Sequence, residues 1–246
     1  MTPAGDVVSE HPFVVAHRGA SIDRPEHTLA AYDLALQEGA DGVECDVRLT
    51  SDGHLVCVHD RRVDRTSSGA GVVSEMTLLQ LQRLDYGAWH SGGQTNSPEA
   101  GSIGDTGLLT LDALVALVLD WHRPVKIFIE TKHPVRYGSM VEREVLALLH
   151  RFGLAAPASA SRSRAVVMSF SAAAVWRIRR AAPQITGTRP EQHRRQQGRG
   201  DHGRCHRDRP VDRDAAGTSG VGRPGRRAGP RAVLLDRRPQ RGRRLL

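Results

Sequence analysis

Residues 42–60, GVECDVRLTSDGHLVCVHD, decide the fold expected of this chain. Apolar residues surround Glu44 and Asp46 in the first half, and a second apolar run ends at His59. The dipeptide Asp52-Gly53 between the two runs is typical of a tight turn. We therefore expect two strands, at residues 42–47 and 54–59, that carry ionisable side chains at their ends.

Predicted strands and helices alternate on both sides of this stretch. Further strands are predicted at residues 13–16, 125–130 and 165–170, and helices at 28–38, 109–121, 140–152 and 172–182. Strands separated by helices favour a parallel sheet that is buried on both faces. Residues 61–107 are rich in Gly and Ser and have little periodicity, so we interpret them as an insertion after the third strand.

The chain changes character near residue 188. Of its 246 residues, those from 188 to 246 include 17 Arg, no Lys and 6 acidic residues, a net charge of +11, whereas the remaining residues carry −3 of the overall +8. No aromatic residue follows Trp176. A segment so charged and so poor in apolar residues cannot offset its ordering entropy by burial. We expect residues 1–187 to form the folded part and 188–246 to be disordered or out of frame.

Two interpretations of this Arg-rich segment compete. It could be a basic arm for nucleic acid or anionic membranes. Such arms normally mix Lys with Arg, so we do not expect nucleic acid as a partner. Alternatively, it is an out-of-frame translation of GC-rich DNA: residues 234–238 can be back-translated so that reading one base later gives CWTVD. A frameshift near Gly187 is the leading hypothesis, and the DNA sequence across codons 185–190 tests it.

Three carboxylates lie on the predicted strands in a pattern that suggests a metal site. Residues i and i+2 of a strand share a face, so Glu44 and Asp46 point the same way, and Glu130 ends the next long strand. Carboxylates aimed at one point repel each other unless a cation lies among them. Oxygen ligands alone favour Mg²⁺ or Ca²⁺ over zinc.

Two histidines and two permanent cations accompany these carboxylates. His17 and His59 end the first and third predicted strands and could act as general acid and base. Arg18 and Lys132 supply positive charge suited to a phosphate group. A metal, two histidines and two cations together indicate phosphoryl transfer rather than acyl or glycosyl transfer.

The sequence resembles the glycerophosphodiester phosphodiesterase family, in particular its actinobacterial cytosolic members. The matching motifs are HRGASIDRPEHT, GADGVECDVRLTSDGHLVCVHD, IETKHP and VVMSF. They extend over about residues 13–187, in the order and spacing of the family. The resemblance implies a (β/α)₈ TIM barrel of the α/β class and a divalent metal. It also implies hydrolysis of glycerophosphodiesters to glycerol 3-phosphate and an alcohol. Glu26, in the PEHT motif, resembles a supporting carboxylate on the substrate side. Many relatives have Asn at the position of His27.

Other expectations follow from the same observations. A frameshifted chain would lack the last three βα units, would leave its first and fifth strands with unpaired edges, and would be weakly active or inactive as written. The competing functions are lysophospholipase D-like use of the same site and an inactive chain with a basic tail. No leader or membrane span is apparent, so we expect a cytoplasmic protein with reduced thiols at Cys45, Cys57 and Cys205.

Overall fold

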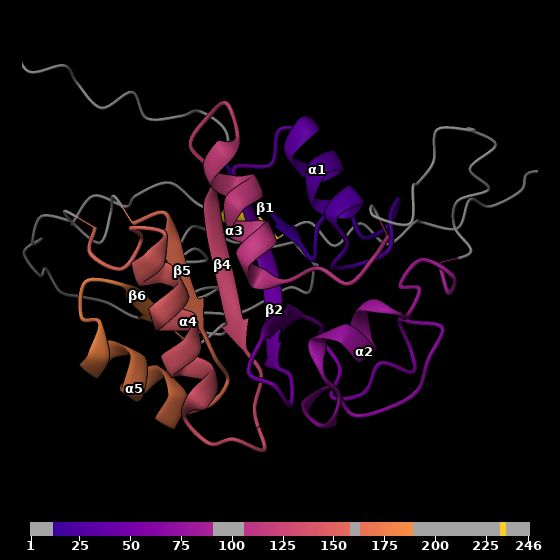
Figure 1. Cartoon of the computed structure of the whole chain (residues 1–246). Coiled ribbons are helices and arrows are strands. Elements are labelled where there is room, and N and C mark those ends of the chain that lie inside the picture. Colours follow the sequence, from indigo (N-terminus) through magenta and orange to yellow (C-terminus); the bar gives the residue numbers. More distant parts are fainter. Residues whose placement is uncertain (1–11, 91–105, 158–162, 189–231, 235–246) are drawn as a thin grey trace, which may run out of the picture.

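The computed structural model describes residues 12–90, 106–157, 163–188 and 232–234. Its centre is a sheet in which the strands follow the order β6–β5–β4–β2–β1–β7 (Figure 1). Every pairing along this path is parallel. The strands are β1 (Phe13–His17), β2 (Gly42–Leu49), β4 (Lys126–Thr131), β5 (Ala165–Met168), β6 (Thr186–Thr188) and β7 (Ala232–Leu234). Consecutive parallel strands joined by helices are the arrangement of a (β/α)₈ barrel, of which the described residues form a part.

Side chains alternate strictly between the two faces of this sheet. One face packs under helices through Val43, Cys45, Val47, Ile127, Ile129, Ala165 and Val167. The alternate residues face the other side, where Val15, Phe128, Val166 and Met168 form a smaller apolar cluster. In the parallel register Asp46 lies beside Glu130, and Glu44 lies beside Phe128. The carboxylates of β2 and β4 therefore share the face that looks into the barrel.

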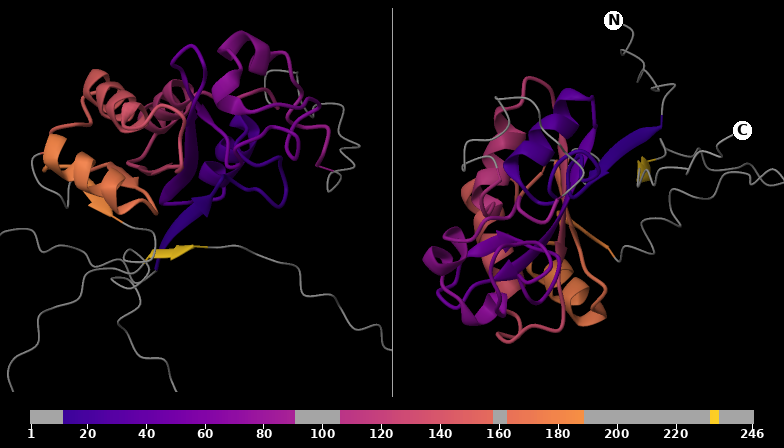
Figure 2. Two further views of the ribbon diagram at one scale, coloured as in Figure 1. Left: turned by 90° about the horizontal axis from the view of Figure 1, so that it is seen from below. Right: turned by 90° about the vertical axis from the view of Figure 1, so that its right-hand side faces the viewer.

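The helices follow the sequence prediction within a few residues. They are α1 (Leu29–Gln37), α3 (Leu111–Asp120), α4 (Met140–Arg151) and α5 (Ala172–Ala181). Figures 1 and 2 show α1, α3 and α4 on one side of the strands, where their apolar residues join one core with β2, β4 and β5. The N-caps Thr28, Thr110 and Ser171 each accept a hydrogen bond from a backbone amide of the first turn, which satisfies a donor that the helix leaves free.

The strand predicted at residues 54–59, counted as the third strand of the barrel, does not belong to the parallel path. β3 (Leu55–Cys57) is antiparallel to β2, with Val47 beside Cys57, and it lies off the parallel path. The reason is local: the turn at Asp52-Gly53, with a φ of 86° at Gly53, reverses the chain directly. A parallel neighbour would have needed a long crossover. β6, and not the strand at 54–59, is thus the fifth parallel strand within residues 12–188.

The expected edge strands also have neighbours. β5 pairs with β6, and β1 pairs in parallel with β7, a short strand from the Arg-rich segment. Figure 2 shows β7, in yellow, beside the end of β1. The prediction of unpaired edges on the first and fifth strands was therefore wrong. In the described residues the strand path is open between β6 and β7.

The part of the insertion that is described has a core of its own. It contains the 3₁₀ helix η1 (Val73–Glu75) and α2 (Leu78–Gln82). Its buried apolar residues Val63, Val73, Leu81 and Tyr86 pack with Val56 and Val58 of the preceding strand segment. These residues come from short elements and from the segments between them, so no single period runs through this part of the sequence. Residues 91–105 of the predicted insertion lie outside the described residues. Among the helices that are described, none has both the length and the apolar character to span a bilayer.

Gly19 fixes the approach of α1 to the end of β1. Its φ is 80°, and a β-carbon at this position would lie 2.6 Å from the backbone carbon of Ala31. The neighbouring Ala20 amide donates to the Ala31 carbonyl at 2.8 Å. Only glycine therefore suits both the backbone conformation and the contact.

We expect Gly19→Ala to lower the free energy of unfolding more than Gly39→Ala does. Gly39 also has a positive φ, of 91°, but a β-carbon there would meet nothing within 4 Å. Gly39→Ala should cost about 1 kcal/mol of left-handed strain, and Gly19→Ala roughly 2 kcal/mol more from the backbone clash. Urea denaturation measures both, and equal losses would contradict the close approach.

Candidate active site

The structure brings together the three carboxylates predicted to bind a metal. Glu44 and Asp46 come from β2 and Glu130 from β4, and one oxygen of each lies within 4.8 Å of the others. All three residues are buried. Their closeness follows from the parallel register, which places Asp46 directly beside Glu130. Like charges so close together, and so far from water, need compensation.

The surroundings shift the pKa values of these three carboxyl groups in different directions. Burial, followed by the charges of Asp46 and Glu130, raises the pKa of Glu44 well above its usual range. Burial likewise raises the pKa of Glu130, with Lys132 acting against it. Burial also opposes the charge on Asp46, but His27, Lys132 and Arg18 outweigh it and hold the pKa of that carboxyl far below its usual range. Asp46 is therefore the permanent anion of the group.

Two permanent cations lie among the carboxylates. Lys132 Nζ is 2.8 Å from Asp46 Oδ1 and 2.6 Å from Glu130 Oε1. Arg18 Nε is 2.9 Å from Asp46 Oδ2, and its backbone amide donates to the Glu44 carbonyl. A φ of 61° at Arg18 turns the chain at the end of β1 so that this side chain enters the cluster. Both predicted phosphate-binding residues thus stand at the site.

The two predicted acid–base residues lie at its rim. His17 Nε2 is 3.7 Å from Glu44 Oε2, and about a third of each histidine side chain is exposed. His59 reaches the site from the hairpin, because Val58 donates its amide to the Asp46 carbonyl next to it. Its Nδ1 lies 2.7 Å from Asp60 Oδ1. Burial lowers the pKa of His59, and the hydrogen bond to Asp60 only partly reverses this.

Comparisons with known proteins identify the family of this chain. The model of the glycerophosphoryl diester phosphodiesterase family matches residues 17–199. The chain belongs to this family. A Mycobacterium tuberculosis (strain ATCC 25618 / H37Rv) protein named "Probable glycerophosphodiester phosphodiesterase 1" is 79% identical over 183 residues, which are 74% of this chain and 65% of that protein. The "Glycerophosphodiester phosphodiesterase" of Bacillus subtilis (strain 168) is 32% identical over 173 residues, 70% of this chain and 57% of that protein.

Solved structures support the same assignment to the phosphodiesterase family. The glycerophosphodiester phosphodiesterase of Agrobacterium tumefaciens is similar with a TM-score of 0.56 and 30% identity, over 72% of this chain and 66% of that one. A phosphodiesterase of Oleispira antarctica, solved in complex with the product sn-glycerol-3-phosphate, gives a TM-score of 0.60 and 27% identity, over 72% and 65%. This chain spans less than two thirds of the length of the curated relatives named above. Such partial coverage fits a chain whose C-terminal part departs from the family sequence.

His27, whose role the sequence left open, lies against the metal-site carboxylates of this phosphodiesterase fold. It is buried, with Nδ1 2.8 Å from the Tyr32 hydroxyl and Nε2 3.1 Å from Asp46 Oδ2. Tyr32 donates its single hydroxyl hydrogen to the Glu44 carbonyl, so its oxygen can only accept at His27. Both ring nitrogens therefore lie within hydrogen-bond distance of an oxygen atom. The sequence could not reveal this contact, because Tyr32 belongs to a helix whose orientation depends on packing.

A network of charges that the sequence did not predict connects Glu26 with His59. Arg65 NH2 and NH1 lie 2.7 and 3.1 Å from the two Glu26 oxygens, and its Nε contacts Asp60. Glu26 also lies 3.3 Å from Arg18 NH1. Asp60, in turn, holds the His59 ring. Arg65, from the insertion, therefore links the supporting carboxylate Glu26 to the catalytic histidine candidate.

The carboxylate group has the properties of a site for a hard divalent cation. Three carboxylates meet on one buried face, and Arg18 and Lys132 are the permanent cations beside them. Carboxylate oxygens gathered in this way are the ligands that hard divalent cations prefer. Glu44, Asp46 and Glu130 thus fit Mg²⁺ or Ca²⁺ in donor type and charge.

We expect Mg²⁺ or Ca²⁺ to stabilise the protein against unfolding, because it would bind only the assembled carboxylates. At a concentration about 100 times the dissociation constant, the gain should be about 2.7 kcal/mol. Glu130→Gln should abolish most of it. Asp112→Asn, which removes an exposed carboxylate on α3, serves as the control. Thermal unfolding in EDTA and in added cation measures the effect, and an equal gain in both variants would argue against this site.

The raised pKa of Glu44 predicts a pH dependence of the metal-free protein. The folded state holds the Glu44 proton to higher pH than the unfolded state, so the unfolded state binds fewer protons in this window. Stability should therefore fall as pH rises above about 4.5, the ordinary value for Glu. The unfolding free energy of wild type minus that of Glu44→Gln, measured with urea in EDTA, should decrease from pH 4 to pH 8. A constant difference would mean that Glu44 titrates normally.

Proposed function

We propose that this chain carries the active site of a metal-dependent phosphodiesterase that hydrolyses glycerophosphodiesters to glycerol 3-phosphate and an alcohol. The observation that carries the proposal is the group of Glu44, Asp46 and Glu130 at the end of the strands, with His17 and His59 at its rim. Membership of the phosphodiesterase family and the product complex of the Oleispira antarctica relative support the substrate class.

His59 is the better candidate for the base. Asp60 accepts the hydrogen on Nδ1, which leaves the lone pair on Nε2. Because burial lowers the pKa of His59, its ring is neutral at neutral pH and can take a proton from the attacking hydroxyl or water. His17, at the end of β1, is then the group that gives a proton to the leaving alkoxide.

Arg18 and Lys132 supply the charge for the phosphate. Both side chains are mostly buried beside the carboxylates, where a cation acts on charge more strongly than in water. A divalent cation held by Glu44, Asp46 and Glu130 would supply Lewis acidity and lower the pKa of a bound nucleophile. Arg65 and Glu26 keep Arg18 and Asp60 in position.

The division of the chain is also part of this proposal. Residues 1–187 would form the phosphodiesterase part, with the insertion at about 61–107, and residues 188–246 would be the departure from the family sequence. The family match to residue 199 and the 183-residue stretch of 79% identity support a change of sequence in this region.

Replacing either histidine should remove most of the activity. We expect His17→Gln and His59→Gln each to lower kcat by about 10²- to 10⁴-fold. His150→Gln, on the exposed side of α4, should leave kcat unchanged. His59→Gln should also remove the acidic limb of the pH–rate profile, which in the wild type lies below the ordinary pKa of histidine.

The measurement is release of glycerol 3-phosphate from glycerophosphoglycerol with Mg²⁺ or Ca²⁺, and again in EDTA. It should be run on this chain and on one whose codons after 187 are read one base later. Turnover that persists in EDTA or in both histidine variants would refute the assigned roles. Activity confined to the second chain would place the loss in residues 188–246.

A further inference from the structure

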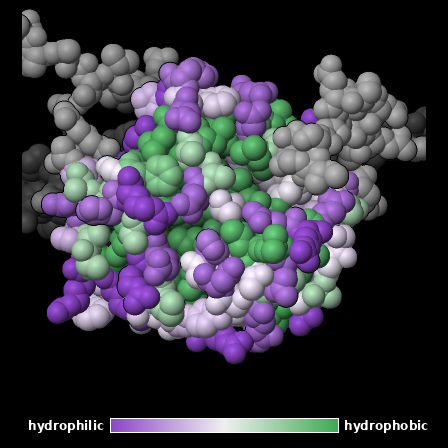
Figure 3. Space-filling model, viewed as in Figure 1, coloured by the Kyte–Doolittle hydropathy of each residue, from purple (hydrophilic) through white to green (hydrophobic). Residues whose placement is uncertain are grey.

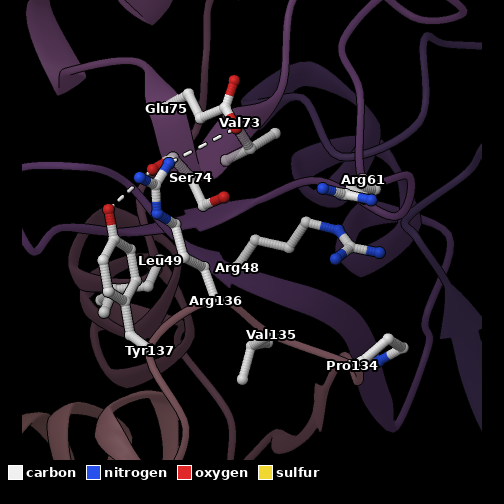
Figure 4. Close-up of a pocket in the computed structure, with 10 residues that line it drawn as sticks. All are labelled: Arg48, Leu49, Arg61, Val73, Ser74, Glu75, Pro134, Val135, Arg136 and Tyr137. Carbon is white, nitrogen blue, oxygen red and sulfur yellow. Dashed lines mark hydrogen bonds and ion pairs between the residues drawn. The ribbon is translucent and has the colours of Figure 1, made fainter.

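A cavity of about 390 Å³ lies beside the proposed active site, between the β2–β3 hairpin, the insertion and the loop after β4 (Figure 4). Its volume is in the range of small-molecule sites. Its walls are Arg48 and Leu49 of β2, Arg61, the segment Val73–Glu75, and the segment Pro134–Tyr137. None of these residues is among the proposed acid–base, phosphate or metal residues.

The charge of this cavity is predominantly positive. Arg48, Arg61 and Arg136 line it, against a single carboxylate, Glu75. Arg136 NH1 lies 3.4 Å from Glu75, and both side chains are more than half exposed, so this ion pair is weak. Within the described residues, no carboxylate forms an ion pair with Arg48 or Arg61. Figure 4 shows the Arg48 guanidinium pointing toward Arg61.

The cavity adjoins the catalytic residues through the backbone. Arg48 donates from Nε and NH2 to the His59 carbonyl, at 3.1 and 2.8 Å, and Arg61 follows two residues later. On the other wall, Pro134 follows Lys132 by two residues. A substrate whose phosphodiester lies at His59 and Lys132 can therefore extend one end into this cavity.

The far wall of the cavity is held in place without a ligand. Tyr137 donates its hydroxyl to the Ser74 carbonyl at 2.7 Å, which ties the loop after β4 to the insertion. At the start of the same loop, His133 contacts the buried Glu142 of α4 at 2.7 Å. A preformed cavity loses little conformational entropy when it binds.

We propose that this arginine-lined cavity binds a second anionic group, a phosphomonoester on the alcohol half of the diester. The proposal rests on the proposed function, because it names the substrate class of that site. Guanidinium groups bind phosphate through paired hydrogen bonds. Arg48 and Arg61 line the same cavity, and no carboxylate of the described residues forms an ion pair with either, so an anion between these two side chains would reduce the repulsion between their charges. Glu75 can be displaced from Arg136 by a doubly charged phosphate.

The test compares two diesters that differ only in this group: glycerophosphoinositol and glycerophosphoinositol 4-phosphate. The kcat/KM for the phosphorylated diester should exceed that for the other, and the ratio should fall about tenfold in an Arg61→Gln, Arg136→Gln double variant. Arg62→Gln, an exposed neighbour that does not line the cavity and pairs with Asp64, is the matched control and should leave the ratio unchanged. Raising the salt concentration should lower the ratio in the wild type only.

The outcomes separate the two proposals. A wild-type ratio of one, or a ratio that the double variant leaves unchanged, overturns the cavity assignment while the hydrolysis itself stands. If neither diester is hydrolysed, the glycerophosphoglycerol assay on both chains decides the proposed function, and calorimetry with glycerophosphoinositol 4-phosphate on wild type and double variant decides the cavity. Inorganic phosphate that binds to the wild type and not to the double variant, together with a substrate ratio of one, would show a site for free anions and overturn the assignment to the substrate.

Discussion

The structure depends on three carboxylates that are buried side by side on the inner face of a parallel sheet. Two unit charges about 4 Å apart repel by about 4 kcal/mol at the effective dielectric constant near a protein surface. Arg18 and Lys132 lie among Glu44, Asp46 and Glu130 and offset part of this repulsion. These two cations do not fully compensate the three carboxylates, as the raised pKa of Glu44 indicates. Buried carboxylates whose mutual repulsion is only partly offset are typical of a binding site.

The hairpin after β2 connects this charge cluster to the rest of the proposed site. Because the chain reverses at the turn and continues as β3, it runs back along β2. This return places His59 next to Asp46. The insertion then contributes Arg65, which joins Asp60 to Glu26, and Arg48 holds the His59 backbone from the other side. His59 is thus fixed by residues from three segments. This explains how a histidine that does not end a barrel strand still reaches the barrel mouth.

Much of the fold and of the site could be predicted because it depends on local pattern. The alternation in β2 and β4 indicated that Glu44, Asp46 and Glu130 share a face, and the structure confirms their meeting. The counting of the strand at 54–59 among the barrel strands was wrong, since the tight turn at Asp52-Gly53 brings this strand back antiparallel to β2. The partners of His27 and Glu26 were also beyond prediction. They come from α1 and the insertion, whose positions depend on packing against residues distant in sequence.

The sequence by itself determined the family, the strand and helix types, and which residue types gather at the strand ends, because these follow from composition and periodicity along the chain. Only the tertiary structure decided that β3 lies outside the parallel path, that β7 lies beside β1, and that Arg65 connects Glu26 to Asp60. It alone revealed the arginine-lined cavity, whose walls come from β2, η1 and the loop after β4. Distances between segments far apart in the chain are set by packing, and no local pattern encodes them.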